Sequence, residues 1–226
     1  MFSPKYAVLA AVGISLLMGA ILISIQGAKT STASVASASN AASNLEASFA
    51  IQSESAAPSS TSQQVIGTAT LSLAAVAKVS SIDDVDNVRW SLVRSSGSTS
   101  GLYSSASGVD WKALRGVSRS GAFRFAAGST WSFNAIFQEG VGYKQASGVL
   151  AGGQCALATV IRGAAMKAGL PTHAKPHRYA IPGFALADSV NIWWGRDDLT
   201  IQNPGSHSLT IAWNLTPAAV TVSILQ

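Results

Sequence analysis

The uncharged stretch "YAVLAAVGISLLMGAILISI" at residues 6–25 is the feature that most constrains how this 226-residue chain is organised. A helix of that length, at about 1.5 Å per residue, spans about 30 Å, which is the thickness of the hydrocarbon core of a bilayer. A secretory signal peptide is the alternative because Lys5 gives it a basic start, but the apolar region of such a peptide is usually only about 7 to 15 residues long. We therefore expect residues 1–27 to form a transmembrane anchor.

Residues 28–64 are mostly Ala, Ser, Thr, Gln and Asn, with few aromatic or branched apolar side chains. A segment of this composition cannot bury enough apolar surface to offset the entropy lost on ordering. We expect a flexible linker there and a folded domain over residues 65–226. Lys5, before the apolar segment, favours an N-terminus in the cytoplasm, which makes this a single-pass protein of the cell membrane with an extracytoplasmic C-terminal domain.

The charges and the cysteine content narrow the possible partners. The chain has 15 Lys and Arg against 10 Asp and Glu, spread along the sequence rather than gathered in one run. This excess suits an acidic wall polymer or lipid headgroups, but without a basic stripe or a metal-finger spacing it does not indicate nucleic-acid binding. Cys155 is the single cysteine, so no internal disulfide can form. We expect membrane and wall partners, no nucleic acid and no cofactor.

The first half of the expected domain reads as mostly β. Residues 65–82 are apolar enough for a strand or a weak helix, and residues 86–95 ("DNVRWSLVRS") alternate apolar and polar side chains, which favours a half-buried strand. Residues 95–110 are rich in Ser and Gly and indicate a loop. Two β-prone runs separated by "AAGS" predict a hairpin over residues 121–137.

The second half contains one clear helix, over residues 154–168. Gly169 and Pro171 supply the expected stop. Leu157 falls on the main apolar stripe of this helix, whereas Cys155 falls on a stripe roughly opposite. Further strands are predicted at residues 176–182, 186–194, on both sides of a turn within 199–215, and at 219–225. The fold class we expect is α+β, with one principal helix packed on a mostly antiparallel sheet.

Cys155 is the first candidate for chemistry because it stands at the expected start of the helix. A helix N-terminus lowers the pKa of a thiol, and Gly152 and Gly153 would admit an oxyanion to the free N–H groups. A cysteine nucleophile needs a base and a group that orients the base. His177 and Asp188 are the candidates, since Asp188 stands among apolar residues and needs a partner.

Other interpretations of the same residues stay open. Free cysteine is often only a small buried hydrophobe, the histidine and aspartate are often structural, and a glycine pair often only forms a turn. A metal site made by Cys155, His173 and His177 is disfavoured, because Pro176 keeps the histidines off a shared helix face and the spacing matches no familiar zinc pattern. We expect no metal. His207 reads as a surface loop residue.

The order of these motifs resembles the VanW family of proteins associated with vancomycin resistance. The resemblance covers about residues 125–215 and is carried by "GSTWSFN" (128–134), "GY" (142–143), "GGQC" (152–155), Thr159, "AGL" (168–170), "PH" (176–177), Asp188 with Val190, and "WGRDDLTIQN" (194–203). The chain departs from the family pattern at Ala151 and Ala156, where a third glycine and a glutamine are usual. It departs again at Lys175 and Arg178, which flank the Pro-His pair in place of a histidine and a serine.

The resemblance implies an exported or membrane-anchored protein that is associated with the cell wall. Our hypothesis is a membrane-anchored cell-envelope protein that acts on or recognises peptidoglycan or its peptide stems. The resemblance supports Cys155, His177 and Asp188 as a set. If the protein is an enzyme, we expect them to act as nucleophile, base and orienting group in cysteine-dependent acyl transfer or amide hydrolysis, as in a hydrolase or transpeptidase. Gly152, Gly153 and Thr159 then become candidate substrate-binding residues. The alternative is a non-catalytic wall-binding or scaffold module, in which the glycine pair and the helix start bind a carboxylate or phosphate.

Overall fold

The computed structural model describes residues 62–140 and 142–226, so the predicted membrane segment and residues 28–61 of the predicted linker lie outside the described residues. Within the described ranges, no helix is both long and apolar enough to cross a bilayer. These residues form a mixed α/β structure with antiparallel sheets, which confirms the predicted fold class at that level.

The first sheet has four antiparallel strands. Their order is β1 (Val65–Ser72), β10 (Ala219–Leu225), β9 (Leu209–Leu215) and β2 (Arg119–Phe125). Alternate side chains of β9 and β10 are buried, among them Ile211, Trp213, Val220 and Val222, as the period of a strand with one face on a core requires. The predicted closing strand at residues 219–225 is confirmed as β10.

The second sheet is also antiparallel, in the order β3 (Thr130–Ser132), β8 (Leu199–Gln202), β6 (Thr172–Pro176) and β7 (Val190–Asn191). A separate pair joins β4 (Gln145–Ala146) to β5 (Val149–Leu150). The predicted hairpin at residues 121–137 is wrong, because β2 pairs with β9 in one sheet and β3 pairs with β8 in the other. The short helix α4 (Phe133–Ile136) follows β3 directly.

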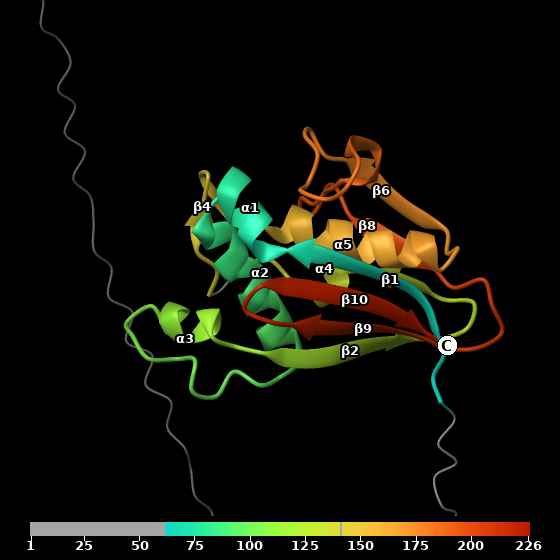
Figure 1. Ribbon diagram of the computed structural model, residues 1–226, viewed down its shortest axis with the longest axis horizontal. Helices are drawn as coiled ribbons and strands as arrows, with labels where there is room; N and C mark the ends of the chain where they lie inside the picture. Colours follow the sequence, from blue (N-terminus) through green and yellow to red (C-terminus); the bar gives the residue numbers. More distant parts are fainter. Residues whose placement is uncertain (1–61, 141) are drawn as a thin grey trace, which may run out of the picture. The chain divides into compact units, whose positions relative to one another are not determined.

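Helix α5 (Gln154–Lys167) lies between the two sheets, packed against β1 and β10 on one side and against β7 and β8 on the other (Figure 1). Its predicted end is confirmed, since Ala168 is the C-cap and Gly169 has φ +73°. The first sheet comes very close to the helix at Gly67, where a Cβ would stand 2.4 Å from the carbonyl oxygen of Ala164. The opposite stripe is also covered by protein, because Cys155 and Thr159 contact the backbone of Ile192 and Val190.

The predicted strand at residues 86–95 is wrong, because these residues belong to helix α2 (Ile82–Ser95). Ser81 caps the helix by accepting the N–H of Asp84, and acidic residues fill its first turn. Asp86 and Asn87 are buried along with the apolar residues. The alternation of apolar and polar residues in the sequence therefore does not match an alternation of buried and exposed side chains. Helix α1 (Leu73–Val79) precedes α2 and packs against it.

The remaining segments are short. Residues 96–110 are a loop, as predicted, and lead to α3 (Trp111–Arg115). The strand predicted at residues 176–182 is wrong: β6 ends at Pro176, the last residue paired with β7, and a loop follows. Only Val190–Asn191 form a strand within the predicted 186–194 segment, after the 3₁₀ helix η1 (Leu186–Asp188).

Candidate functional site

A pocket of about 290 Å³ opens at the start of α5. Its wall is assembled from α1, the first turn of α2, the β4–β5 pair, the start of α5, the loop after β6 and the end of β7. The side chains of chemical interest in this wall are Asp84, Cys155, His177, Tyr179, Asn191 and Trp193. We call this cavity the α5 pocket. It brings two of the three predicted catalytic residues together.

The sulfur of Cys155 is turned towards the backbone at the end of β7. It accepts a hydrogen bond from the N–H of Ile192 at 3.4 Å and lies 3.9 Å from the carbonyl oxygen of that residue. Burial raises the pKa of the Cys155 thiol. The backbone contact with Ile192 opposes this effect, and the charges of Asp84 and Asp197 add to it. The pKa lowering predicted from the helix start is therefore wrong, because the second sheet covers the thiol.

His177 lines the same pocket, but its ring contacts Tyr179. Its Nδ1 lies 2.9 Å from the carbonyl oxygen of Tyr179, and its ring meets the Tyr179 ring edge-on with centroids 4.3 Å apart. Within the described part of the chain, no hydrogen bond joins His177 to Cys155. The two residues share a cavity without forming the predicted nucleophile and base contact.

Asp188 does not line the α5 pocket, although the sequence analysis grouped it with His177. It lines a separate cleft beside the later turns of α5, together with Gly163, Met166 and Phe184. Among residues 62–140 and 142–226, no hydrogen bond or ion pair connects its carboxylate to His177. The fold keeps this carboxylate out of the α5 pocket because it belongs to the turn that precedes β7.

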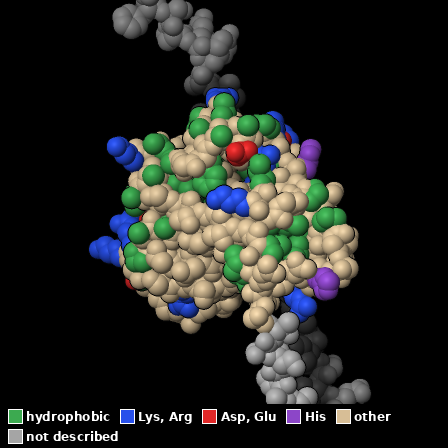
Figure 2. Space-filling view, turned by 45° about the vertical axis from the view of Figure 1, so that its right-hand side comes forward, with side chains coloured by type: hydrophobic (Ala, Val, Ile, Leu, Met, Phe, Trp, Pro, Cys, Tyr) green, Lys and Arg blue, Asp and Glu red, His purple; other side chains and the backbone are tan. Residues whose placement is uncertain are grey.

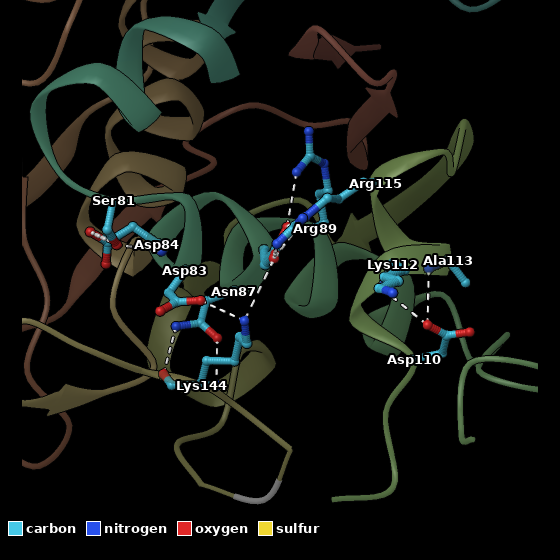
Figure 3. A network of polar contacts seen from close by, with 11 residues as sticks. Ser81, Asp83, Asp84, Asn87, Arg89, Asp110, Lys112, Ala113, Arg115 and Lys144 are labelled. Atoms are coloured by element: carbon cyan, nitrogen blue, oxygen red, sulfur yellow. Dashed lines mark hydrogen bonds and ion pairs between the residues drawn. The ribbon is translucent and has the colours of Figure 1, made fainter. Parts of the chain in front are cut away.

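The carboxylate that does line the α5 pocket is Asp84, which the sequence reasoning missed. Its side chain is beside Ser81 in the first turn of α2 (Figure 3), and Ser81 Oγ donates to Asp84 Oδ2 at 3.0 Å. Burial raises the pKa of Asp84, the Ser81 hydrogen bond lowers it and the neighbouring charge of Asp83 raises it further. The spacing Ser81-x-x-Asp84 is that of a capping box and could have shown that Asp84 lies in the first turn of a helix.

Gly152 and Gly153 allow the start of α5 to lie directly against this aspartate. A Cβ on Gly152 would stand 2.1 Å from Asp84 Oδ1, and a Cβ on Gly153 would stand 2.1 Å from the backbone oxygen of Asp84. Gly153 also has φ +85°. The space at the helix start, where the sequence suggested a bound carboxylate or phosphate, therefore holds an acidic side chain of the protein itself.

Thr159 does not line the pocket. It is fully buried, and its Oγ1 donates to the carbonyl oxygen of Cys155 at 2.7 Å and accepts the N–H of Val190 at 2.9 Å. The hydroxyl of Thr159 therefore acts both as a donor and as an acceptor within the fold. Thr159 thus fastens β7 to α5, which places Ile192 against the sulfur of Cys155.

A polar network joins α2 to α3 and to the segment before β4 (Figure 3). Asp86 is completely buried and pairs with Arg89 at 3.1 Å and Arg115 at 3.0 Å, and Lys144 approaches it at 4.0 Å. Asn87 holds the backbone of Lys144 through two 2.8 Å hydrogen bonds. The network holds the segment before β4 against α2.

The other candidate residues lie apart from the α5 pocket. His173 lines a small cleft with Thr172 and Thr200, and His207 lies by the turn after β8. Among the described residues, no three His, Cys, Asp or Glu side chains are grouped as a metal site would need. On the face shown in Figure 2, Lys and Arg side chains are scattered rather than joined in one patch.

Comparisons of the chain with family models, with curated proteins and with solved structures found no match.

Proposed function

We propose that the domain is a non-catalytic binding module of the cell envelope, which takes a peptide stem of peptidoglycan into the α5 pocket. The observation that carries this proposal is the orientation of Cys155, whose sulfur is bonded to the backbone of Ile192 and not to His177. A thiol kept neutral by its surroundings is a weak nucleophile. The pocket around it is still available to a ligand.

The rim of the pocket supports binding of a partly apolar ligand. Four of its large side chains are more than half exposed: Val79 (65%), Val149 (53%), Tyr179 (60%) and Trp193 (54%). Ligand sites commonly combine such an apolar wall with a few polar groups that fix orientation. Here Asp84 and Asn191 supply the polar groups. The small volume suits a short part of a peptide rather than a whole glycan strand.

The envelope location rests on the sequence. The apolar segment at residues 6–25 would anchor the chain, and a linker of about 40 residues would give a root-mean-square reach of about 35 Å. This reach would hold the domain near the wall rather than against the bilayer. The resemblance to the VanW family supports the same setting, and the principal helix with its flanking antiparallel strands would be the folded unit that is presented there.

Calorimetric titration of the full chain with soluble peptidoglycan fragments tests the proposal. Val149 and Leu150 are neighbours on β5, and both are exposed, but only Val149 lines the pocket. Val149→Trp should obstruct the pocket and weaken binding by about tenfold or more, while Leu150→Trp should leave it unchanged. Equal binding by the two variants would place the ligand elsewhere, and an absence of binding by the unaltered chain would refute the proposal.

A second candidate is cysteine-dependent acyl transfer or amide hydrolysis, favoured by the presence of Cys155 and His177 in one pocket. His177 would take the thiol proton and pass it to the leaving amine, and water or another amine would then take the acyl group from sulfur. This function requires the His177 ring to leave Tyr179. Reactivity of Cys155 that falls in the His177→Ala variant would support it.

A further inference from the structure

Asp84 differs from the other buried aspartates of the described residues in having no cationic partner. Asp86 is paired with Arg89 and Arg115, and Asp197 is paired with Lys175 and Arg196. Asp84 is only 6% exposed, and its hydrogen-bonding partner is the neutral side chain of Ser81. A buried carboxylate without a counterion is costly, so this position is suited to a cation from outside.

The surroundings of Asp84 offset only part of that cost. It stands in the first turn of α2 and touches the start of α5, where helix dipoles favour a negative charge. These partial charges bring no formal positive charge into the pocket. The other titratable side chains of the pocket are Cys155, His177 and Tyr179, and the structure joins none of them to Asp84 by a hydrogen bond or ion pair.

The shape of the pocket indicates which cation would fit. A metal such as calcium requires six to eight oxygen ligands, whereas no three acidic, His or Cys side chains gather among the described residues. Apolar side chains line the same pocket as this single carboxylate, including Val76, Val79, Ile181 and Ile192. An ammonium group on an aliphatic stem matches this combination, since the stem contacts apolar surface while the charged end meets the carboxylate.

We propose that the α5 pocket recognises a primary amine on an aliphatic stem, with Asp84 as the counterion of its ammonium group. This inference rests on the proposed function in that it names the part of the peptide stem that enters the pocket. The acidic group that fills the helix start would at the same time repel carboxylates and phosphates. Selection for cationic ligands over anionic ones follows from this one side chain.

Ligand-observed NMR titration of the full chain at pH 7 tests the inference with three small probes: n-pentylamine, N-pentylacetamide and pentanoate. The amine should bind, and its dissociation constant should rise about tenfold or more in Asp84→Asn, the effect of losing a charge-assisted hydrogen bond. Asp83→Asn is the matched control, because Asp83 is the neighbouring acid and pairs with Lys144 instead. It should bind the amine as the unaltered chain does.

The acetamide probe tests the same point without altering the protein, since acetylation removes the positive charge. Equal binding of the amine and the acetamide, unchanged binding in Asp84→Asn, or displacement of the amine by equimolar calcium would overturn the inference. Peptidoglycan fragments that bind equally before and after acetylation of their amines would refute the amine site and leave the proposed function standing. Amine binding that depends on Asp84, with no binding of any fragment, would support the amine site and refute the proposed function.

Discussion

The backbone N–H of Ile192 donates to the sulfur of Cys155 across 3.4 Å and so joins the end of β7 to the start of α5. Two residues before Ile192, the N–H of Val190 is taken by Thr159 from the same helix. The stripe of α5 that carries Cys155 and Thr159 thus works as an attachment surface for the second sheet. Cys155 is both a wall of the α5 pocket and a part of this attachment.

Alkylation of Cys155 by iodoacetamide should be slow at neutral pH, and its rate should rise with a midpoint above that of an ordinary cysteine. Burial raises the pKa of the thiol, and the thiolate is the reactive form. Intact-mass spectrometry measures the rate at a single site because the chain has one cysteine. The urea-unfolded chain is the control and should show an ordinary midpoint. A midpoint below that control would contradict the account.

The same pKa shift predicts how stability depends on pH. The folded chain holds the thiol proton more tightly than the unfolded chain, so this contribution is complete below the unfolded pKa and is lost as pH rises through the folded pKa. Urea unfolding of the unaltered chain should therefore show a steeper alkaline loss of stability than Cys155→Ala. The variant retains Tyr143, whose pKa burial also raises, so the difference isolates the thiol.

Replacing Thr159 with valine should reduce the free energy of unfolding by about 1–3 kcal/mol, because the buried N–H of Val190 loses its acceptor. Thr159→Ser keeps the hydroxyl and should cost clearly less. Denaturant titration of the two variants measures the difference. Equal losses would mean that the hydroxyl does not hold β7 in place.

A matched pair of glycine variants tests the close contact between α5 and α2. Gly153 and Gly169 flank the same helix and both have positive φ, but a Cβ meets Asp84 only at Gly153 and has open space at Gly169. Gly153→Ala should be less stable than Gly169→Ala by about 1–3 kcal/mol, the usual cost of overpacking. Thermal and urea unfolding of both variants provide the comparison. Similar stabilities would show that the two helix starts do not touch as described.

Asp86 should be the most sensitive acid of the α2 network. Asp86→Asn leaves the buried Arg89 without its partner and should cost about 3–5 kcal/mol. Asp83, three residues earlier on α2, is more than a third exposed and pairs with Lys144, so Asp83→Asn should cost less than about 1 kcal/mol. Urea unfolding of the two variants at one salt concentration checks the ranking, and a reversed ranking would contradict it.

Patterns within a short stretch of sequence were sufficient to predict those elements that short-range signals determine. The end of α5 follows from Gly169 and Pro171, and β10 follows from strict alternation. Helix α2 was misread because Asp86 and Asn87 are polar yet buried, so that polar residues no longer mark the solvent face. The capping box at Ser81 was the stronger local signal for this helix.

The composition of the site depends on contacts that no local pattern contains. Cys155 and His177 were predicted together and do share a pocket. Asp188 was grouped with them because a carboxylate among apolar residues needs a partner, but it lines a separate cleft. Asp84 reaches the pocket because α2 packs against the start of α5, a contact between segments far apart in the chain. The pairing of β2 with β9 is likewise a long-range contact.

The most direct test of the account is mass spectrometry of peptidoglycan fragments and of the protein after incubation together, for the unaltered chain and for Cys155→Ala. We predict that both proteins bind the fragments with similar affinity, that the fragments keep their masses, and that the protein gains no covalent adduct. Cleaved fragments or an acyl adduct formed by the unaltered chain, and absent with Cys155→Ala, would contradict the binding-module account and assign the pocket to cysteine catalysis.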